Sequence, residues 1–320
     1  MIDLPKSVWT LVIGVGMLGG LLALTTGMIW IERRVLARFQ DRLGPNRVGP
    51  MGLLQPIADI IKLFMKEDWM PPFADRLAYI LAPSIIVITV LMAFAVVPIT
   101  ESIKVSDANV GVIFFLGMTS LGVYSIVLAG WGSNSKYSLI GGMRAAAQMI
   151  SYELPMAVAL AGVVLLAGSF RLIDVANAQA RLWYCLLQPI GFVVFTIAGI
   201  AEARRTPFDL PEADSELVAG YHTEYSSMKF ALFFMGEYLD VILISAMVTV
   251  LYLGGWHGPL LPPVLWFIIK MFAVIFLFIW CRAVLPRYRF DQLMGFGWKL
   301  LLPLSLVNLV ATGAVMLAVR

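Results

Sequence analysis

Residues 182–201 read LWYCLLQPIGFVVFTIAGIA, and residues 202–224 then read EARRTPFDLPEADSELVAGYHTE. The first stretch has no charged side chain. At about 1.5 Å per residue it is long enough for a helix to cross a hydrocarbon core of ~30 Å. The second stretch holds six of the chain's 20 carboxylates. Carboxylates crowded at a membrane boundary repel one another and lose hydration, so we expect their pKa values to rise toward the range where protons move.

The composition of the whole chain is that of an integral membrane protein. Of its 320 residues, 60% are hydrophobic and 13% are charged, whereas soluble domains carry roughly 25% charged residues. Backbone groups in lipid must form their hydrogen bonds within one segment, so the long apolar segments are expected to be helices. We therefore predict a single all-α membrane domain, residues 1–320, with about eight transmembrane helices. The predicted spans are 7–31, 77–100, 108–131, 145–168, 182–201, 229–253, 263–285 and 298–319.

The chain carries few side chains of the kind that hold redox centres. Cys185 and Cys281 lie far apart in apolar surroundings, and His222 and His257 are isolated. Without a Cys-x-x-Cys pair, an iron–sulfur cluster, a haem pair or a structural zinc is not expected on this chain. Small buried hydrophobic side chains are the simpler interpretation of both cysteines.

The distribution of basic residues predicts the orientation. With eight spans, the connections after the first, third, fifth and seventh face one side, and 17 of the 23 Lys and Arg residues lie in or beside them. The positive-inside rule places these connections in the cytoplasm, or in the equivalent compartment of an organelle, and both termini outside. The expected location is the bacterial plasma (inner) membrane.

The first cytoplasmic connection, residues 32–76, is too long to be a turn. Within it, residues 52–66 place apolar side chains on one helical face and polar ones on the other. This helix is too short to span and should lie along the membrane surface. It could be a plain surface anchor, or it could stand beside an opening through which a lipid-soluble substrate enters. Asp59 among apolar neighbours favours the second interpretation.

Charged residues also fall inside predicted spans. Glu153 and Glu237 are expected to face protein or water, because an ionised carboxylate in the hydrocarbon core costs several kcal/mol, and such residues often serve ion movement. Asp240 follows Glu237 by three residues and should share its helical face. A structural ion pair, for example Arg144 with Glu153, is the alternative, and Lys270 could neutralise Glu237 or Asp240.

Several motifs are specific enough to suggest a family. They are ERR (32–34), GPNRVG (44–49), LQPIAD (54–59), KLFMKE (62–67), SNSKYS (133–138), TPFDLPEA (206–213) and PRYRFDQLM (286–294). By these motifs and their order along residues 1–320, the chain resembles the membrane-subunit family that joins the two arms of respiratory complex I, the proton-pumping NADH:quinone oxidoreductase. Its members are the H subunit in bacteria and subunit 1 in mitochondria.

The resemblance implies a part in an enzyme whose redox centres lie elsewhere. The implied substrate is ubiquinone or menaquinone, while NADH, FMN and iron–sulfur clusters are held by partner subunits. The implied partners are the peripheral-arm iron–sulfur and quinone-site subunits, small membrane subunits, antiporter-like subunits and membrane lipid, without nucleic acid. The residues implied along the quinone chamber are Arg33, Arg42, Asp59, Phe234, Tyr238 and Arg282. Those implied in proton coupling are Arg144, Glu153, Glu202, Asp209, Glu212, Glu216, Glu224 and Glu237.

Two other functions share some of these features. The anchoring subunit of a membrane-bound hydrogenase or formate hydrogenlyase would keep the proton coupling but lose NADH or quinone. The GPNR loop with the amphipathic helix after it favours the quinone enzyme. An independent ion channel or transporter would also bury carboxylates. That function does not account for the basic, motif-dense cytoplasmic face, which suits the docking of another protein.

Overall fold

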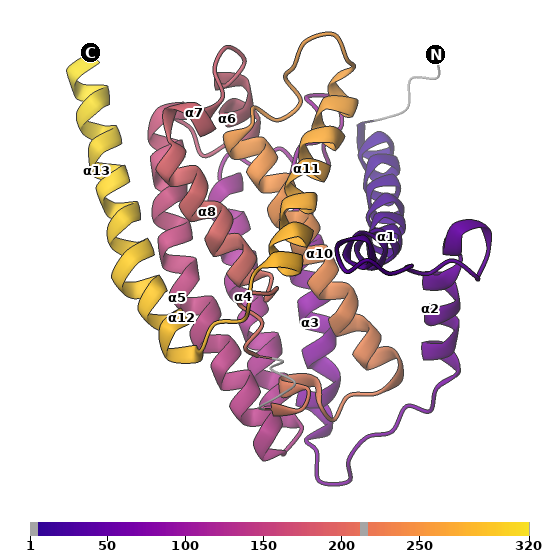
Figure 1. Ribbon diagram of the computed structural model, residues 1–320. Coiled ribbons are helices and arrows are strands. Elements are labelled where there is room, and N and C mark those ends of the chain that lie inside the picture. The colour runs from indigo at the N-terminus through magenta and orange to yellow at the C-terminus, as the bar shows by residue number, and fades with distance from the viewer. Residues whose placement is uncertain (1–5, 212–216, 320) are drawn as a thin grey trace.

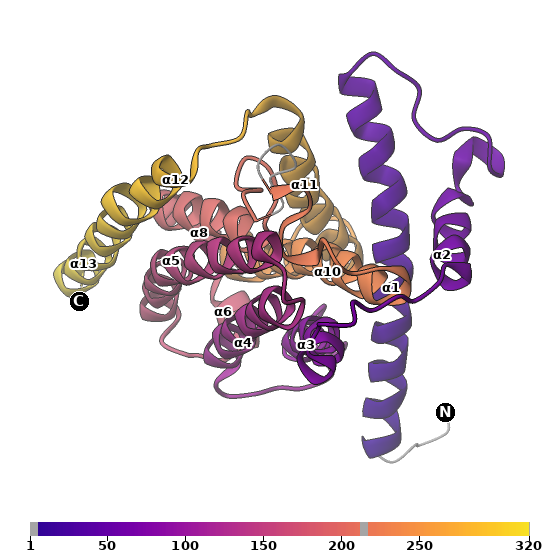
Figure 2. The same ribbon diagram turned by 90° about the horizontal axis from the view of Figure 1, so that it is seen from below.

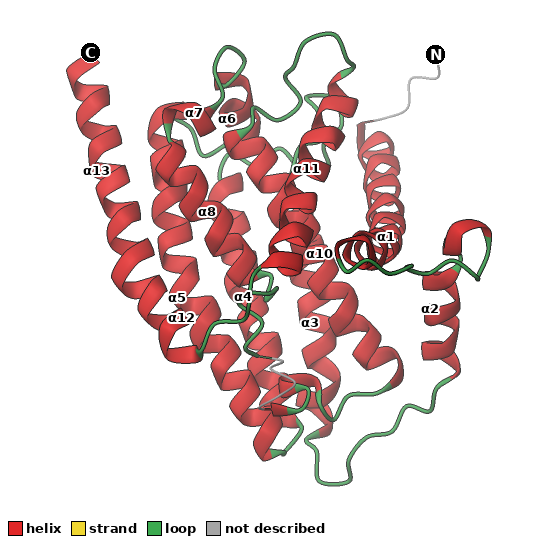
Figure 3. Ribbon diagram, viewed as in Figure 1, coloured by secondary structure: helices red, strands yellow, loops and turns green. Residues whose placement is uncertain are grey.

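A computed structural model describes residues 6–211 and 217–319, and the regular structure in these ranges is entirely helical (Figure 3). Seven helices of the described chain are long and apolar enough to cross a membrane, which confirms the predicted all-α membrane fold. They lie in α1 (Lys6–Phe39), α3 (Arg76–Phe94), α4 (Gly111–Gly132), α5 (Lys136–Ala167), α10 (Ser227–Tyr252), α11 (Pro263–Val284) and a run of α12 (Phe290–Phe296), a π-helical turn (Gly297–Leu301) and α13 (Leu302–Val319). The shorter helices include α6 (Leu172–Ala178).

The stretch predicted as a span at 182–201 is not one continuous helix. It contains α7 (Tyr184–Leu187) and α8 (Pro189–Glu202), with Gln188 between them at φ −130° and ψ 63°. Pro189 explains the break, because proline has no N–H and its ring disfavours a helical backbone in the residue before it. The 14 residues of α8 rise about 21 Å, less than a hydrocarbon core of ~30 Å.

The long helices form a bundle with α10 at its centre (Figure 1). α10 packs against α3, α8 and α11, while α5 packs against α4, α8 and α13. The close approach of α4 to α5 depends on Gly130, where a Cβ would lie 2.6 Å from the carbonyl oxygen of Ser138. Small residues at such crossings let helix backbones approach each other in membranes. The chain runs through the bundle in the seven long helices and also in α8, which makes an even number of passes. The start of α1 and the end of α13 therefore lie at the same end of the molecule (Figure 1).

α1 runs along one side of the bundle at a steep tilt, and α2 (Gln55–Met65) lies beside it (Figure 2). α2 occupies the segment predicted to be amphipathic, and several of its apolar side chains are exposed. The hydroxyl of Ser227, the first residue of α10, donates to the carbonyl oxygens of Leu63 and Lys66 at 3.0 and 2.9 Å. These bonds fix the end of α2 against the bundle. Its position at a membrane surface stays a prediction.

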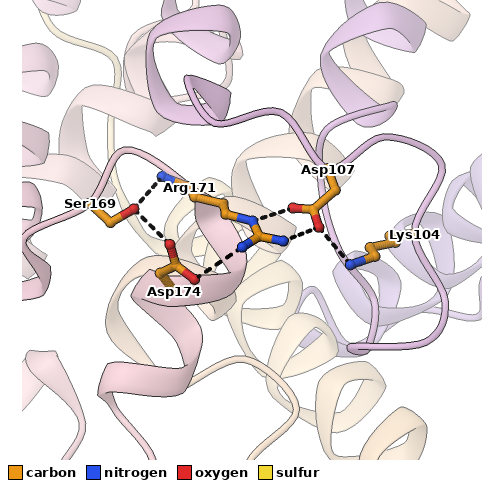
Figure 4. A network of polar contacts seen from close by, with 5 residues as sticks. All are labelled: Lys104, Asp107, Ser169, Arg171 and Asp174. Atoms are coloured by element: carbon orange, nitrogen blue, oxygen red, sulfur yellow. Dashed lines mark hydrogen bonds and ion pairs between the residues drawn. The ribbon is translucent and has the colours of Figure 1, made fainter.

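A polar network joins the α3–α4 connection to the start of α6, at the end of the molecule where the termini lie (Figure 4). Asp107 accepts hydrogen bonds from Nε (2.6 Å) and Nη2 of Arg171, and from Nζ of Lys104 (2.7 Å). Asp174 lies 3.7 Å from the same guanidinium and accepts a hydrogen bond of 2.8 Å from Ser169. The hydrogen bonds from Arg171 hold the pKa of Asp107 well below its ordinary value.

We expect Asp107→Asn to lower the apparent unfolding temperature of the detergent-solubilised protein by a few degrees, because Arg171 then lacks a carboxylate. A lowered folded-state pKa stabilises the protein above the unfolded pKa, and this stabilisation is lost as the pH falls through the folded pKa. The difference between wild type and variant should therefore be full at pH 7 and begin to shrink below about pH 4. Glu101→Gln, an exposed change in the same connection, is the control, and equal unfolding temperatures at pH 7 would contradict the prediction.

Candidate functional site

The acidic connection begins at the end of α8, where Arg204 has a left-handed backbone. Its φ is 53°, a conformation that costs non-glycine residues about 1 kcal/mol and that often marks functional positions. The buried guanidinium lies 3.0 Å from Oδ2 of Asp240 and 3.3 Å from the Tyr221 hydroxyl. Tyr221 donates to Oε1 of Glu237 at 2.8 Å. These four residues, the Arg204 cluster, join the acidic connection to the carboxylates of α10.

Glu237 and Asp240 thus point to one cluster, as their spacing predicts, but the prediction that Lys270 neutralises either of them is wrong. The ammonium of Lys270 donates to three carbonyl oxygens at 2.6 to 3.0 Å, those of Leu253, Gly255 and His257. These carbonyls follow the far end of α10. Since Leu253 is 13 residues from Asp240, about 20 Å along the helix, Lys270 is out of reach, and Arg204 is the cation beside Asp240.

Glu153 lies in the middle of α5 and is held by two hydroxyl groups of α4. Ser120 donates a short hydrogen bond to Oε1 of Glu153, and the Thr119 hydroxyl lies 3.4 Å from the same oxygen. The alternative of an ion pair between Arg144 and Glu153 is wrong. Both residues lie on α5, nine positions apart, which is about 13.5 Å along a helix. The Arg144 guanidinium instead lies 5.8 Å from the centre of the Phe290 ring.

A cavity of about 10 Å³ connects the surroundings of Glu153 with the Arg204 cluster. Its polar lining residues are Thr89, Thr119, Glu202, Arg204 and Asp240. This volume admits about one water molecule. Glu202, the last residue of α8, is 4% exposed, and its Oε2 has no hydrogen-bond partner among the described residues. The predicted proton-coupling residue Glu202 therefore stands at the junction of the two groups.

A second cluster, buried except for the partly exposed Arg282, lies on the α1 side of the acidic connection. Glu32 of α1 forms an ion pair with Arg282 of α11, and its Oε1 lies 3.7 Å from Nη1 of Arg205. The Arg205 guanidinium lies over the ring of Tyr238, 4.2 Å from its centre. We call these four residues the Glu32 cluster. It unites two of the residues implied along the quinone chamber, Tyr238 and Arg282, with two that sequence reasoning did not select.

Arg33 and Asp59, which the resemblance also places along the chamber, form an ion pair of 2.6 Å between α1 and α2. Burial by itself would raise the pKa of Asp59. The hydrogen bonds from Arg33 and Gln55 outweigh this effect, so the pKa of Asp59 lies below its ordinary value. The carboxylate is therefore charged at neutral pH and holds α2 to α1.

The other two residues of that set lie apart in the structure. The ring of Phe234 is 4.9 Å from that of Tyr238, so Phe234 adjoins the Glu32 cluster. Arg42 lies beyond the end of α1, is exposed, and donates a hydrogen bond of 2.8 Å to Gln40. The chain by itself therefore brings five of the six predicted chamber residues near the α1 side of the acidic connection, and Arg42 stays outside this group.

An apolar pocket of about 560 Å³ lies along α1, α10 and α11, nearer to the termini than the Glu32 cluster. Its lining includes Met17, Leu21, Phe94, Ile242, Phe267 and Met271. The polar cluster and the apolar pocket thus follow one another along the same three helices. This order suits a molecule with a polar head and an apolar tail.

The other two acidic residues of the connection that the structure describes, Asp209 and Glu224, have separate anchors. Asp209 forms an ion pair of 3.0 Å with Arg287, in the segment before α12. The backbone carbonyl of Glu224 accepts a hydrogen bond of 2.6 Å from the hydroxyl of Tyr79 on α3. The predicted coupling residues Glu212 and Glu216 lie outside the described residues.

Sequence reasoning missed several residues of these clusters. Glu32, Arg204 and Arg205 stand next to long apolar stretches, and charge at such a boundary could have pointed to them. Ser120 and Thr119 are small hydroxyl residues inside an apolar span, where they usually bond their own helix. Nothing local in the sequence distinguishes them.

Comparison with known proteins agrees with the motifs. The family model of NADH dehydrogenase matches residues 12–313. The chain belongs to this family. It is 54% identical over 306 residues to the H subunit of NADH-quinone oxidoreductase from Methylococcus capsulatus, covering 95% of this chain and 97% of that protein. It is 52% identical over 303 residues to H subunit 2 of the same enzyme from Syntrophobacter fumaroxidans, covering 92% of each, and 51% identical over 305 residues to H subunit 1 from Geobacter metallireducens, covering 92% and 93%.

The resemblance to the H subunit of complex I is therefore confirmed, and with it membership of a multi-pass membrane-arm family. A protein of this family works within a larger assembly. The identity as a subunit of this enzyme implies other subunits of the same enzyme as partners.

Gly141 of α5 offers a test of how the Arg204 cluster is positioned. A Cβ there would lie 2.7 Å from both the Cα of Gly220 and the backbone N of Tyr221, and backbone atoms cannot turn aside as a side chain can. We expect Gly141→Ala to displace Tyr221 and to destabilise the protein by about 1–3 kcal/mol. Thermal unfolding and enzyme activity of the assembled complex are the measurements.

The matched control is Gly117→Ala in α4, where a Cβ meets nothing within 4 Å. This variant should be neutral or slightly more stable, because alanine favours helix by up to about 1 kcal/mol over glycine. If the two variants have equal unfolding temperatures and equal activities, the contact between Gly141 and the acidic connection does not position the Arg204 cluster.

Proposed function

We propose that this chain forms part of the quinone chamber of a proton-pumping NADH:quinone oxidoreductase and couples quinone reduction to proton translocation. The observation that carries the proposal is the adjacency of two buried clusters. Arg204 belongs to one cluster and the next residue, Arg205, to the other. On α10, Glu237 belongs to the Arg204 cluster, and the next residue, Tyr238, belongs to the Glu32 cluster.

On the quinone side, the Glu32 cluster offers charged and hydroxyl groups to a polar headgroup, and the apolar pocket offers space for an apolar tail. The proposed wall of the quinone chamber also includes Arg33, Asp59 and Phe234. Arg42 would complete this wall only together with a partner subunit. NADH, FMN and iron–sulfur clusters belong to partner subunits in this proposal. The present chain binds the quinone, ubiquinone or menaquinone, and holds no electron carrier of its own.

On the proton side, a charge that appears or disappears near the Glu32 cluster acts on the Arg204 cluster by Coulomb interaction. At a separation of about 10 Å and an effective dielectric constant of about 20, one unit charge changes the energy of another by about 1.7 kcal/mol, roughly one pKa unit. This is enough to shift protons among coupled carboxylates. The residues proposed to share in this response are Arg144, Glu153, Glu202, Asp209, Glu212, Glu216, Glu224 and Glu237.

The surroundings of the chain follow from the same proposal. The basic connections face the cytoplasm of a bacterium and dock the peripheral-arm subunits, and both termini lie outside. Small membrane subunits and antiporter-like subunits flank the bundle. The relatives' names favour the quinone enzyme over a hydrogenase anchor. Co-purification of NADH- and FMN-binding chains with this protein tests that choice, and a nickel–iron partner would reverse it.

We expect Glu202→Gln and Glu237→Gln to reduce the number of protons pumped per electron, because each variant removes a titrating carboxylate from the path. Glu212→Gln and Glu216→Gln should act in the same direction. The measurement is proton uptake during NADH-driven quinone reduction by the assembled complex in proteoliposomes. Glu101→Gln, on an exposed connection at the other end of the molecule, is the control. Wild-type proton-to-electron ratios in all four variants would refute the coupling proposal.

The quinone side has a test of its own. Asp59→Asn leaves Arg33 without its carboxylate, so the end of α1 should loosen and the KM for quinone should rise severalfold. Oxidation of NADH with an artificial acceptor should stay unchanged, because that reaction bypasses the quinone. Asp68→Asn, which breaks the ion pair of a more exposed carboxylate with Lys229, is the matched control. A quinone KM raised equally in both variants would argue against a specific role for the Arg33–Asp59 pair.

A further inference from the structure

The cavity between Glu153 and the Arg204 cluster raises the question of how a proton crosses it. No hydrogen bond joins Glu153 to Glu202 directly among the residues that the structure describes. Proton transfer needs donor and acceptor within hydrogen-bond reach of each other, or one water between them; the reach is about 2.6–3.2 Å in the reacting complex and often longer without substrate. A group that touches both Glu153 and the cavity would supply the missing contact.

Thr119 is that group. Of the two α4 hydroxyls beside Oε1 of Glu153, Ser120 makes the shorter contact but is not among the residues that line the cavity. Thr119 lies 3.4 Å from the same oxygen and does line it. We infer that Thr119 relays protons between Glu153 and Glu202 through one water molecule in this cavity. The inference rests on the proposed function, of which it names one step.

The surroundings of the Thr119 hydroxyl suit a relay. It lies 2.9 Å from the carbonyl oxygen of Leu116 and 3.4 Å from Glu153, so its single proton has two acceptors and can turn from one to the other by rotation of the hydroxyl. Thr119 is 9% exposed, which shields the hydroxyl from bulk water. A hydroxyl both donates and accepts, whereas the cation of Arg204, which also lines the cavity, can only donate.

The water also has partners on its other side. The unpartnered Oε2 of Glu202 belongs to a buried residue that lines the cavity, and Arg204 and Asp240 line it as well. A buried water usually makes about three hydrogen bonds to groups that would otherwise be unsatisfied. Thr119, Glu202 and the Arg204–Asp240 pair meet this number.

The step conserves every proton. The protonated Glu153 gives its proton to the Thr119 oxygen while the Thr119 hydroxyl gives its own proton to the water. The water passes one of its protons to the Glu202 carboxylate. Glu153 ends as a carboxylate and Glu202 as a carboxylic acid, while the threonine and the water are restored. The hydroxyl must then rotate back before the next transfer.

The test compares Thr119→Val, Thr119→Ser and Thr196→Val in the assembled complex in proteoliposomes. Valine keeps the shape of threonine but removes the hydroxyl, and serine keeps the hydroxyl. Thr196 on α8 is similarly buried and bonds its own helix at 2.7 Å, with no place in the cavity lining. Its variant therefore controls for the loss of a buried hydroxyl as such.

We expect Thr119→Val to slow proton-coupled quinone reduction by about tenfold and to raise its solvent deuterium isotope effect. This loss is smaller than the ~10²-fold typical of a lost proton-transfer group, because the titrating groups Glu153 and Glu202 are both kept. Thr119→Ser should restore both readouts, and Thr196→Val should match wild type. Wild-type behaviour of Thr119→Val, equal losses in both valine variants, or failure of serine to restore function would each overturn the relay.

Glu202→Gln separates this inference from the proposed function. If Glu202→Gln impairs pumping while Thr119→Val does not, the relay is refuted and the coupling role of the carboxylates stands. If both variants pump like wild type, the relay is refuted, and the coupling proposal fails with it when the Gln variants of Glu212, Glu216 and Glu237 also pump like wild type. Assembly of each variant is checked by NADH oxidation with an artificial acceptor, which does not depend on proton transfer in this chain.

Discussion

The polar interior of this protein depends on two consecutive arginines at the end of α8. Ionised carboxylates inside a helical bundle each cost several kcal/mol unless a cation or strong hydrogen bonds compensate them. Arg204 compensates Asp240, and Arg205 stands beside Glu32. Both also lie next to the carboxyl end of a helix, where the helix dipole favours positive charge. The left-handed backbone at Arg204 is one local strain that this arrangement requires.

Because the two arginines are neighbours in the chain, the clusters cannot move independently. The Cα atoms of consecutive residues are about 3.8 Å apart, and α10 enforces the same adjacency through Glu237 and Tyr238. A shift of the Arg205 backbone toward or away from Glu32 must therefore displace the backbone that holds Arg204. In the proposed function, charge and geometry act together: a change at the quinone alters the field at the carboxylates and also moves their main cation. Long-range rearrangement of the bundle is not needed for this.

The sequence predicts those features that depend on local pattern. Apolar length identified the membrane helices, and the spacing of Glu237 and Asp240 placed them on one face. Partners that meet only through packing were not predictable: Lys270 reaches carbonyls at the end of α10, and Glu153 reaches the hydroxyls of α4. Both wrong pairings assumed that a buried charge seeks a charge of opposite sign. Pro189 was a local signal for the helix break before it, but the prediction of this span considered only the length of the apolar segment.

The order of polar and apolar surfaces along α1, α10 and α11 constrains how an amphipathic ligand could lie. On α1, Glu32 comes eight residues after Leu24, which lines the apolar pocket, and this is about 12 Å along the helix. An apolar tail beside the charged cluster would remove water from these ions without offering hydrogen bonds in return, so the reverse orientation is strongly disfavoured. The proposed quinone site thus has a direction, with the headgroup beside Arg205. Arg205 would therefore be the first residue to sense a change in the headgroup. Its neighbour in the chain, Arg204, is the residue that holds Asp240.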